Sequence, residues 1–384
     1  MRLAVLTSGR QDWGILRSTC RLLQEDAFFE LQLLVGGMHL SEKFGKTQNI
    51  IHEDGFTPAA LLPWVDDAGE WSATRQASEA VKALGECLPK LGSQALMLVG
   101  DRFETAAAAL AATMVRVPVV HVHGGEETAG AIDNGLRHSV SKLSHLHLVS
   151  STEHAARLHA LGEDPQTVHV VGAPGLDNLH RTDLATRDEL EAWLGISLTR
   201  PVVLVTLHPT TLASQPLAEA QTLCEAMNCL PSTYIITLPN VDPGFQPLAE
   251  MLKSAGKQPG RAVVQALGER RYWGLMKLAD AMLGNSSSAL IEAPALSLGA
   301  VNIGDRQQGR QRGANVIDVQ PRADEIVAAM QRILQPDFRH WLRQQPQPFG
   351  DGRSAPRIVS ILRGWTPPQP PRKRLISIPT TGET

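Results

Sequence analysis

Ionisable side chains that could exchange protons follow two apolar runs of the sequence. Asp101 and Arg102 come directly after the run ALMLVG, and His208 comes directly after VVLVTL. A carboxylate or an imidazole removes or delivers a proton when its pKa suits the reaction, and an imidazole does so near neutral pH. The pattern therefore indicates acid–base chemistry. Asp101 could instead only cap the helix that follows it, which is a common role for aspartate.

Two histidines alternate in the segment HVHGGEE, where one residue separates His121 from His123. Side chains alternate across a strand, so we expect both imidazoles on the same side of it. Metal-dependent hydrolases also use this spacing, and His145 and His147 would be candidate further ligands. No HExxH or Cys–His spacing accompanies the pattern, so we expect no metal. Hydrogen-bonded core histidines are the alternative for His145 and His147.

Groups suited to an anion follow three further predicted strands. The first strand runs into TSGRQDWG, a turn into a helix where Arg10 could neutralise an anion. The run GNSSS at 284–288 places small polar residues at a helix N-terminus, and Glu292 lies inside that helix. The loop at 304–313 concentrates three arginines. We expect phosphate binding here, with an ordinary N-cap at 284–288 and a surface cation at Arg10 as the alternatives.

The elements that would position these groups are alternating strands and helices. Short aliphatic runs such as RLAVLT alternate with stretches whose apolar residues recur with the helical period, which predicts parallel strands and crossover helices. The pattern occurs twice. The expected fold class is therefore α/β, with two doubly wound Rossmann-like domains, 1–172 and 173–345, facing each other across a crevice that holds the ligand. The Pro-rich tail at 366–384 should be poorly ordered.

Composition and charge exclude several classes of protein. The chain has 384 residues and a formal net charge of −3, which fits two globular domains and argues against nucleic-acid binding through bulk charge. Its four cysteines form no CxxC pair, which is typical of the reducing cytoplasm. A signal peptide and a long apolar run are both missing, so we expect no export and no membrane span. No GxGxxG or P-loop motif supports a dinucleotide or nucleotide-triphosphate site.

The chain resembles the hydrolysing UDP-N-acetylglucosamine 2-epimerases of sialic-acid-type sugar biosynthesis. The resemblance rests on seven motifs in the family's order, SGRQDWG, GDRFET, HVHGGE, IDNGLRHSVSKLSHLH, LHPTT, GNSSSALIE and NIGDRQQGR. It implies a GT-B-like fold in which residues 346–365 return a helix to the first domain. It also implies a UDP-sugar and UDP as ligands and no cofactor. We further expect a homo-oligomer, a dimer or a tetramer, in which exposed helices of the first domain could pair.

The resemblance also implies an activity. UDP would leave C1 of the sugar as the C2 proton is lost, and water would then add to 2-acetamidoglucal to yield N-acetylmannosamine. The alternative substrate is UDP-2,4-diacetamido-2,4,6-trideoxyglucose, on the route to legionaminic acid. A GT-B glycosyltransferase or a protein that only senses a UDP-sugar would share the phosphate-binding motifs. Neither would require carboxylates at both Asp101 and Asp133 beside His208.

Residue roles follow from the same resemblance. His123 stands where relatives carry Glu, which makes Glu126, three residues on, the nearest substitute base. The implied catalytic residues are Asp101, Glu126, Asp133 and His208. The implied substrate-binding residues are Arg10, Arg102, His123, Ser286, Ser287, Glu292 and Arg306, with Arg10 and the two serines on the diphosphate and Glu292 on the ribose.

Overall fold

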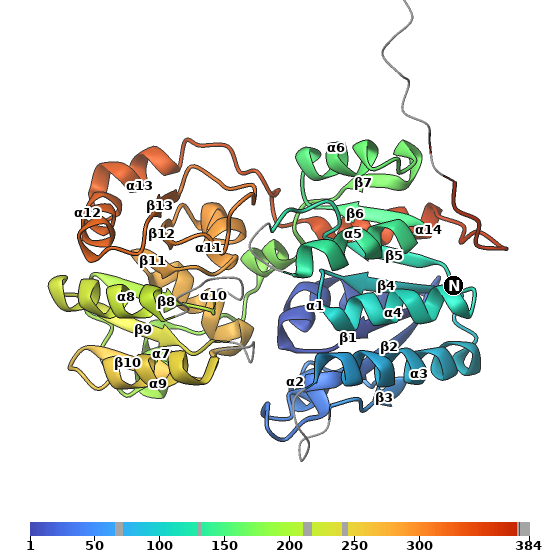
Figure 1. The fold of residues 1–384 in the computed structure, drawn as a ribbon, viewed down its shortest axis with the longest axis horizontal. Coiled ribbons are helices and arrows are strands. Elements are labelled where there is room, and N and C mark those ends of the chain that lie inside the picture. Colours follow the sequence, from blue (N-terminus) through green and yellow to red (C-terminus); the bar gives the residue numbers. More distant parts are fainter. Residues whose placement is uncertain (66–71, 129–131, 210–216, 240–244, 375, 377–384) are drawn as a thin grey trace, which may run out of the picture. The chain divides into compact units, whose positions relative to one another are not determined.

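The computed structural model describes residues 1–65, 72–128, 132–209, 217–239, 245–374 and 376. They form two compact units (Figure 1). The first comprises the described residues of Met1–Glu126, Asp133–Asp177 and Phe349–Thr384, and the second comprises those of Glu127–Ile132 and Asn178–Pro348. Each unit is a parallel sheet flanked by helices, which confirms the expected α/β class with two Rossmann-like domains.

The first unit contains seven parallel strands in the order β3-β2-β1-β4-β5-β6-β7. Strand β4, in the middle of the order, is apolar and buried over its whole length, because helices cover both faces of the sheet. The order reverses between β1 and β4, and the loops that leave this point carry Arg10 and Asp101. Ligands of doubly wound sheets bind at such a reversal. The strands are β1 (Arg2–Thr7), β2 (Glu30–Gly36), β3 (Ala60–Leu62), β4 (Ala95–Val99), β5 (Val119–Val122), β6 (Leu146–Val149) and β7 (Val168–Val170).

Helices of the first unit follow the predicted alternation. The alanine-rich sequence of α4 lets it pack closely against α3, because alanine keeps the two backbones near each other. The α-helices are α1 (Arg10–Glu25), α2 (Gln48–Glu53), α3 (Ala73–Leu91), α4 (Phe103–Met114), α5 (Asp133–Leu143), α6 (Thr152–Ala160) and α14 (Ser354–Gly364). Short 3-10 turns are η1 (Gly37–Leu40), η2 (Pro165–Thr167) and η3 (Pro174–His180).

The C-terminal part of the chain returns to the first unit. Helix α14 packs against α1, and its first two N–H groups, those of Ser354 and Ala355, donate to the Asp177 carboxylate at 2.8 and 2.6 Å. The tail that we expected to be poorly ordered makes specific contacts at 366–374 and at Ile376, whose N–H donates to the carbonyl of Gly162 at 3.1 Å. Residues 375 and 377–384 of that tail lie outside the described residues.

The second unit contains six parallel strands in the order β10-β9-β8-β11-β12-β13. Gly284 ends β11 with φ 136°, and a Cβ there would lie 2.0 Å from the carbonyl oxygen of Thr206 in β8. Only glycine therefore lets the two strand ends meet. The strands are β8 (Val202–Thr206), β9 (Thr233–Thr237), β10 (Arg261–Val264), β11 (Ala281–Gly284), β12 (Gly299–Ile303) and β13 (Val316–Val319).

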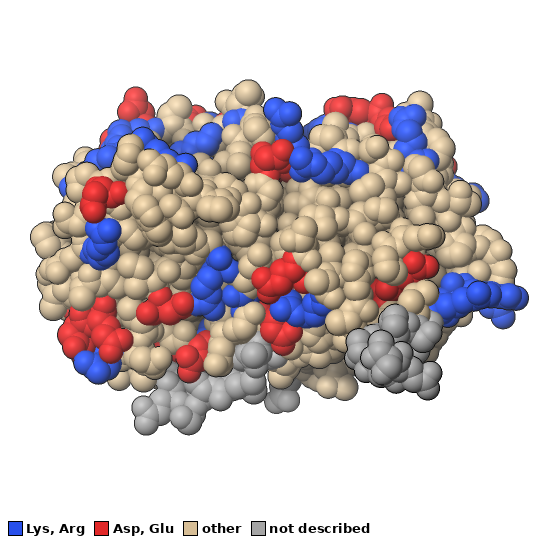
Figure 2. All heavy atoms as spheres, turned by 90° about the horizontal axis from the view of Figure 1, so that it is seen from above, with Lys and Arg blue, Asp and Glu red and all other residues tan. Residues whose placement is uncertain are grey.

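Helices also flank the second sheet. They are α7 (Arg187–Leu194), α8 (Ala218–Cys229), α9 (Phe245–Ala255), α10 (Gly268–Leu278), α11 (Ser288–Ile291), the 3-10 helix η4 (Ala293–Leu296), α12 (Ala323–Ile333) and α13 (Pro336–Leu342). No helix in the described part of the chain is both long enough and apolar enough to cross a bilayer. On the face shown in Figure 2, acidic and basic side chains are interspersed and no broad surface of one sign forms.

Candidate functional site

Asp101 is joined to helix α5 by an ion pair. Its carboxylate, at the end of β4, accepts a hydrogen bond from Nη2 of Arg137, whose side chain is almost fully buried. Asp133 lies four residues before Arg137 and therefore on the same face of α5. Asp101 is not the N-cap residue of α4, which is Arg102, and the Arg102 side chain makes no capping hydrogen bond. Helix α5 thus links two of the expected catalytic carboxylates.

A second cluster of charged side chains lies near the start of α1 and includes residues from the start of α4. Arg102 donates from Nε and Nη2 to the buried Glu104 carboxylate at 3.2 and 3.3 Å. The Asp12 carboxylate is buried and accepts from the N–H and the hydroxyl of Ser8 at 2.9 and 2.7 Å. Burial raises the pKa of Asp12, although the Ser8 hydrogen bonds and the charge of Arg102 oppose the rise. Asp12 therefore belongs with the charged groups near the start of α1.

Arg10 is the first residue of α1. Burial lowers the pKa of its guanidinium. Among the residues that the structure describes, no side chain forms an ion pair with it. A partly buried cation at a helix N-terminus is costly without a counter-charge, so this position suits an anion.

The two histidines of HVHGGEE have different environments. His121 uses both ring nitrogens, with Nδ1 3.1 Å from the Ser141 hydroxyl and Nε2 2.8 Å from the carbonyl oxygen of Gly100. The expectation that His121 and His123 lie on one side of a strand is wrong, because His123 is not part of a strand. Strand β5 ends at Val122, and His123 adopts a left-handed φ of 66° that breaks the alternation. His123 Nδ1 instead lies 2.6 Å from Oε1 of Glu126, and both side chains are buried.

His145 and His147 both bond to protein groups. Nδ1 of His145 accepts the N–H of Val119 at 3.2 Å, and Nε2 of His147 lies 3.0 Å from the Glu163 carboxylate. Burial lowers the pKa of both imidazoles. Among the described residues, no group of three or more His, Cys, Asp or Glu side chains is arranged to hold a metal ion.

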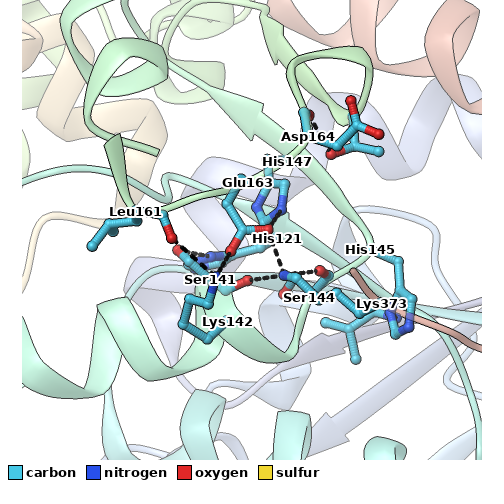
Figure 3. Close-up of polar contacts among 12 residues, drawn as sticks. His121, Ser141, Lys142, Ser144, His145, His147, Leu161, Glu163, Asp164 and Lys373 are labelled. Atoms are coloured by element: carbon cyan, nitrogen blue, oxygen red, sulfur yellow. Dashed lines mark hydrogen bonds and ion pairs between the residues drawn. The ribbon is translucent and has the colours of Figure 1, made fainter. Parts of the chain in front are cut away.

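Glu163 forms the centre of a charged cluster (Figure 3). Its carboxylate lies 2.7 Å from Nζ of Lys142 and 2.5 Å from Nζ of Lys373 in the C-terminal tail. Nζ of Lys373 also donates to the carbonyls of Ser141 and Ser144, so all three N–H groups of this ammonium have acceptors. This pairing explains why the tail is held in place. The cluster packs against the end of α5 opposite Asp133.

His208 follows β8 in the second unit, and Asn285 holds its backbone. The N–H of His208 donates to Oδ1 of Asn285 at 2.7 Å, and Nδ2 of Asn285 donates to the His208 carbonyl at 2.9 Å. The same amide nitrogen lies 3.1 Å from the Glu219 carboxylate. Asn285 lies in the GNSSS run, whose sequence alone did not predict this contact. Its buried side chain fixes the loop that carries His208.

The serine run stands at the start of a short helix. Ser286 accepts the N–H of Ser288 at 3.3 Å, and the Tyr272 hydroxyl donates to Ser288 at 2.7 Å. Glu292 was expected inside this helix, but α11 ends at Ile291 and Glu292 joins it to η4. Burial and the Glu292 charge both raise the pKa of Tyr272. Ser287 is the N-cap residue but makes no side-chain capping bond.

The three arginines of the loop at 304–313 are not equivalent. Arg306 donates from Nη1 to the carbonyl of Asn285 at 3.1 Å, and Asn285 directly precedes Ser286. Nε of Arg310 donates to the hydroxyl of Thr128 at 3.0 Å, and Arg312 forms an ion pair with Asp318. Arg306 is therefore the one that the fold attaches to the turn carrying Ser286.

The expected site residues fall into two groups. The first unit holds Arg10, Asp101, Arg102, His123, Glu126 and Asp133, and the second holds His208, Ser286, Ser287, Glu292 and Arg306. A cavity of about 570 Å³ elsewhere in the second unit is lined by residues that include Arg200, Asp280 and Arg339, and by none of the expected site residues. Asp12, Arg137 and Asn285 were missed. The spacing of four residues between Asp133 and Arg137 could have indicated Arg137, because it places both side chains on one face of a helix.

Comparison with known proteins identifies the family. Residues 21–363 match the family described as UDP-N-acetylglucosamine 2-epimerase. The chain is 32% identical over 371 residues to UDP-N,N'-diacetylbacillosamine 2-epimerase (hydrolyzing) of Legionella pneumophila, covering 94% of this chain and 95% of the relative. It is 32% identical over 342 residues to GDP/UDP-N,N'-diacetylbacillosamine 2-epimerase (hydrolyzing) of Campylobacter jejuni, covering 88% of each.

A solved structure agrees in fold. UDP-GlcNAc 2-epimerase of Neisseria meningitidis bound to UDP-GlcNAc superposes with a TM-score of 0.80 at 18% identity, covering 94% of this chain and 99% of that chain. The GT-B-like architecture is thereby confirmed. The family match covers most of the described chain, and the two curated relatives align over nearly their whole length. This protein therefore belongs to the UDP-N-acetylglucosamine 2-epimerase family of enzymes.

Proposed function

We propose that this protein is a hydrolysing 2-epimerase that acts on UDP-2,4-diacetamido-2,4,6-trideoxyglucose, which is UDP-N,N'-diacetylbacillosamine. The observation that carries the proposal is the nearly full-length similarity to the Legionella pneumophila relative, whose name gives this substrate and this reaction. The Campylobacter jejuni relative supports the same sugar at the same identity. Our main expectation from the sequence, UDP-N-acetylglucosamine, becomes the second candidate.

The proposed reaction consumes water and releases UDP. The C2 proton is removed, the C1–C2 double bond forms, and the C1–oxygen bond breaks with its electron pair going to the diphosphate. Water then adds hydroxyl to C1 of the glucal and a proton to C2 from the opposite face, which gives the free sugar with inverted C2. Such a site must exchange a carbon-bound proton and stabilise charge on the departing diphosphate.

The site residues take roles within this proposal. Asp101 and Asp133 are proposed as carboxylates that act on the sugar, and the Arg137 ion pair supports Asp101 as an ionised group. His208 is proposed as an acid or base from the second unit. Arg10 is proposed to bind the diphosphate, because it is a partly buried cation at the start of α1. The remaining proposed contacts to the diphosphate, sugar and nucleotide are Arg102, Ser286, Ser287, Glu292 and Arg306.

The second candidate is the same chemistry on UDP-N-acetylglucosamine, with N-acetylmannosamine as product. The description of the matching family, which names UDP-N-acetylglucosamine, favours it. The two substrates differ at C4, which carries an acetamido group in one and a hydroxyl in the other, and at C6, which is deoxygenated in the first. A site built for an amide rejects a hydroxyl when its own polar groups are left unpaired.

One experiment tests the proposal. The protein is incubated in D2O with each UDP-sugar in turn, UDP release is measured, and the product is examined by proton NMR. We expect UDP and a product with deuterium at C2, and a kcat/KM at least about tenfold higher for the diacetamido sugar, equivalent to about 1.4 kcal/mol. A preference for UDP-N-acetylglucosamine would establish the second candidate. Protium retained at C2 would contradict elimination, and no UDP release from either sugar would refute both.

A further inference from the structure

His123 lies beside Asp101 at the ends of two neighbouring strands. β4 and β5 pair in register at Val99 and Val122, so His123 is one residue beyond this pair and Asp101 is two residues beyond it. The carboxyl ends of parallel strands are where α/β enzymes place reacting groups. An ionisable side chain at 123 is therefore well placed for a substrate that Asp101 contacts.

The backbone holds His123 in a conformation that few residues other than glycine adopt. Its φ of 66° is left-handed and costs about 1–2 kcal/mol in a residue with a Cβ. The His123 N–H donates to the carbonyl of Leu148 in β6 at 3.1 Å, which fixes the turn. At Gly125 a Cβ would lie 2.3 Å from the carbonyl oxygen of His154. Strain of this kind persists where a side chain must be held in a particular place.

Glu126 determines which nitrogen of His123 carries the proton. Nδ1 of His123 lies 2.6 Å from Oε1 of Glu126, and the relative exposures of the two residues are 7% and 5%. A carboxylate only accepts hydrogen bonds, so the neutral imidazole carries its proton on Nδ1 and leaves a lone pair on Nε2. Among the described residues no group forms a hydrogen bond with Nε2. The lone pair on Nε2 therefore has no protein partner within the described part of the chain.

A further hydrogen-bond chain holds Glu126. The Ser150 hydroxyl donates to Oε1 of Glu126 at 3.2 Å and lies 2.8 Å from Nδ1 of His154. Burial lowers the pKa of His154 to about 4, so this imidazole is neutral at pH 7 and brings no competing positive charge. His154 therefore does not compete with His123 as a cation beside this carboxylate. This arrangement, an imidazole oriented by a carboxylate with its second nitrogen open, is that of a general base.

Two other buried histidines of the first unit differ in this respect. His121 bonds through both nitrogens to Ser141 and Gly100, and His39 bonds through both to Thr7 and Thr47, each at 2.8 Å. An imidazole with both nitrogens occupied cannot take a proton from a substrate without breaking a buried hydrogen bond. His123 has no such cost.

We propose that His123 is a catalytic residue that accepts the C2 proton through Nε2, and that Glu126 is a positioning residue that acts through it. This inference rests on the proposed function. It reverses the roles expected from the sequence, where Glu126 was the base and His123 a substrate contact. The C2–H electron pair forms the C1–C2 double bond as UDP leaves, and the proton goes to Nε2, from which the imidazolium releases it to solvent before the next turnover. In the hydration step the new C2 proton comes from the opposite face, from a carboxylic acid or from water.

The test uses glycine at position 123. His123→Gly fits the left-handed backbone and leaves a cavity the size of an imidazole, so exogenous imidazole should enter it. We expect kcat for UDP release to fall at least about 100-fold, because a general base contributes roughly that much. We expect imidazole at about 100 mM to raise kcat of the His123→Gly variant at least about tenfold. UDP affinity, measured by calorimetry, should stay within about threefold.

Glu126→Gln tests the positioning role. A glutamine amide can donate to Nδ1 and so favours the tautomer with the proton on Nε2, which has no lone pair for the C2 proton. We expect kcat to fall at least about 30-fold with KM within about threefold, and we expect imidazole to give no rescue, since no cavity exists. His159→Ala, an exposed histidine of α6, is the matched control and should retain wild-type kcat with or without imidazole.

The outcomes separate this inference from the proposed function. If the wild-type protein releases no UDP from either sugar, the proposed function fails. If it turns over while His123→Gly keeps more than about a third of kcat, or loses activity without imidazole rescue while remaining folded and binding UDP, the assignment of His123 is overturned. Wild-type kcat in Glu126→Gln would overturn the role of Glu126.

Discussion

Glu163→Gln is predicted to destabilise the first unit substantially. The Glu163 side chain is 1% exposed and contacts His147, Lys142 and Lys373. Burial alone would raise the pKa of this carboxyl, but the hydrogen bonds from His147 and the two lysines outweigh it and lower the pKa to about 2 from 4.5. That difference corresponds to about 3 kcal/mol of stability at pH 7.

The pH dependence of this contribution has a definite sign. A carboxyl whose pKa is lower in the folded protein than in the unfolded chain stabilises the fold at pH values above the unfolded pKa. The contribution is lost as the pH falls from about 4.5 towards 2. The difference in unfolding free energy between the wild type and Glu163→Gln should therefore be about 3 kcal/mol at pH 7 and about 1 kcal/mol at pH 3.

Hydrogen exchange in increasing urea measures the unfolding free energy of the first unit separately from that of the second. Peptides from α5 and β6 report opening of the first unit, and peptides from the second unit serve as an internal reference. Glu153→Gln is the control, because Glu153 is half exposed and forms a 3.2 Å ion pair with Arg157 on the same helix, which should contribute less than about 1 kcal/mol. A loss below about 1 kcal/mol at pH 7 for Glu163→Gln, or an equal loss at pH 3, would refute the reasoning.

Two other substitutions or treatments give clear expectations. Asn285→Ala removes the two hydrogen bonds to the His208 backbone and the one to Glu219, so it should lower the unfolding free energy of the second unit by about 2–3 kcal/mol and kcat at least tenfold; wild-type kcat would contradict its role. Cys20 is fully buried, and burial raises its pKa to about 12, so it should not react with a thiol reagent at pH 8 until the protein is denatured, whereas exposed Cys229 should react at once. Labelling of Cys20 in the native protein would contradict this.

Local sequence patterns were enough to predict the fold class. A strand that is buried on both faces is a continuous apolar run, as ALMLV in β4 is, and a helix that buries one face has apolar residues at the helical period, as α1 has. Both patterns can be recognised within a short stretch of sequence. The repeat of this alternation predicted two α/β domains. The family could be identified because its motifs are short and occur in order. The expectation of a homo-oligomer stays a prediction.

Predictions that depended on one local pattern were the ones that the structure corrected. Strand alternation placed His121 and His123 on one side, but β5 ends between them and the backbone turns left-handed. Proline content predicts a poorly ordered tail over 366–384, but in the described part of that tail Lys373 meets three acceptors that come from 141, 144 and 163. A composition cannot indicate an acceptor more than 200 residues away in sequence.

The sequence by itself determined which strands, helices and reactive side-chain types this protein has, because these depend on neighbours within a few residues. Only the tertiary structure decided which charged groups pair. Asp101 meets Arg137, and Lys373 of the C-terminal tail meets Glu163. The physical reason is that the cost of a buried charge depends on partners brought together by packing, and packing assembles them from distant parts of the chain.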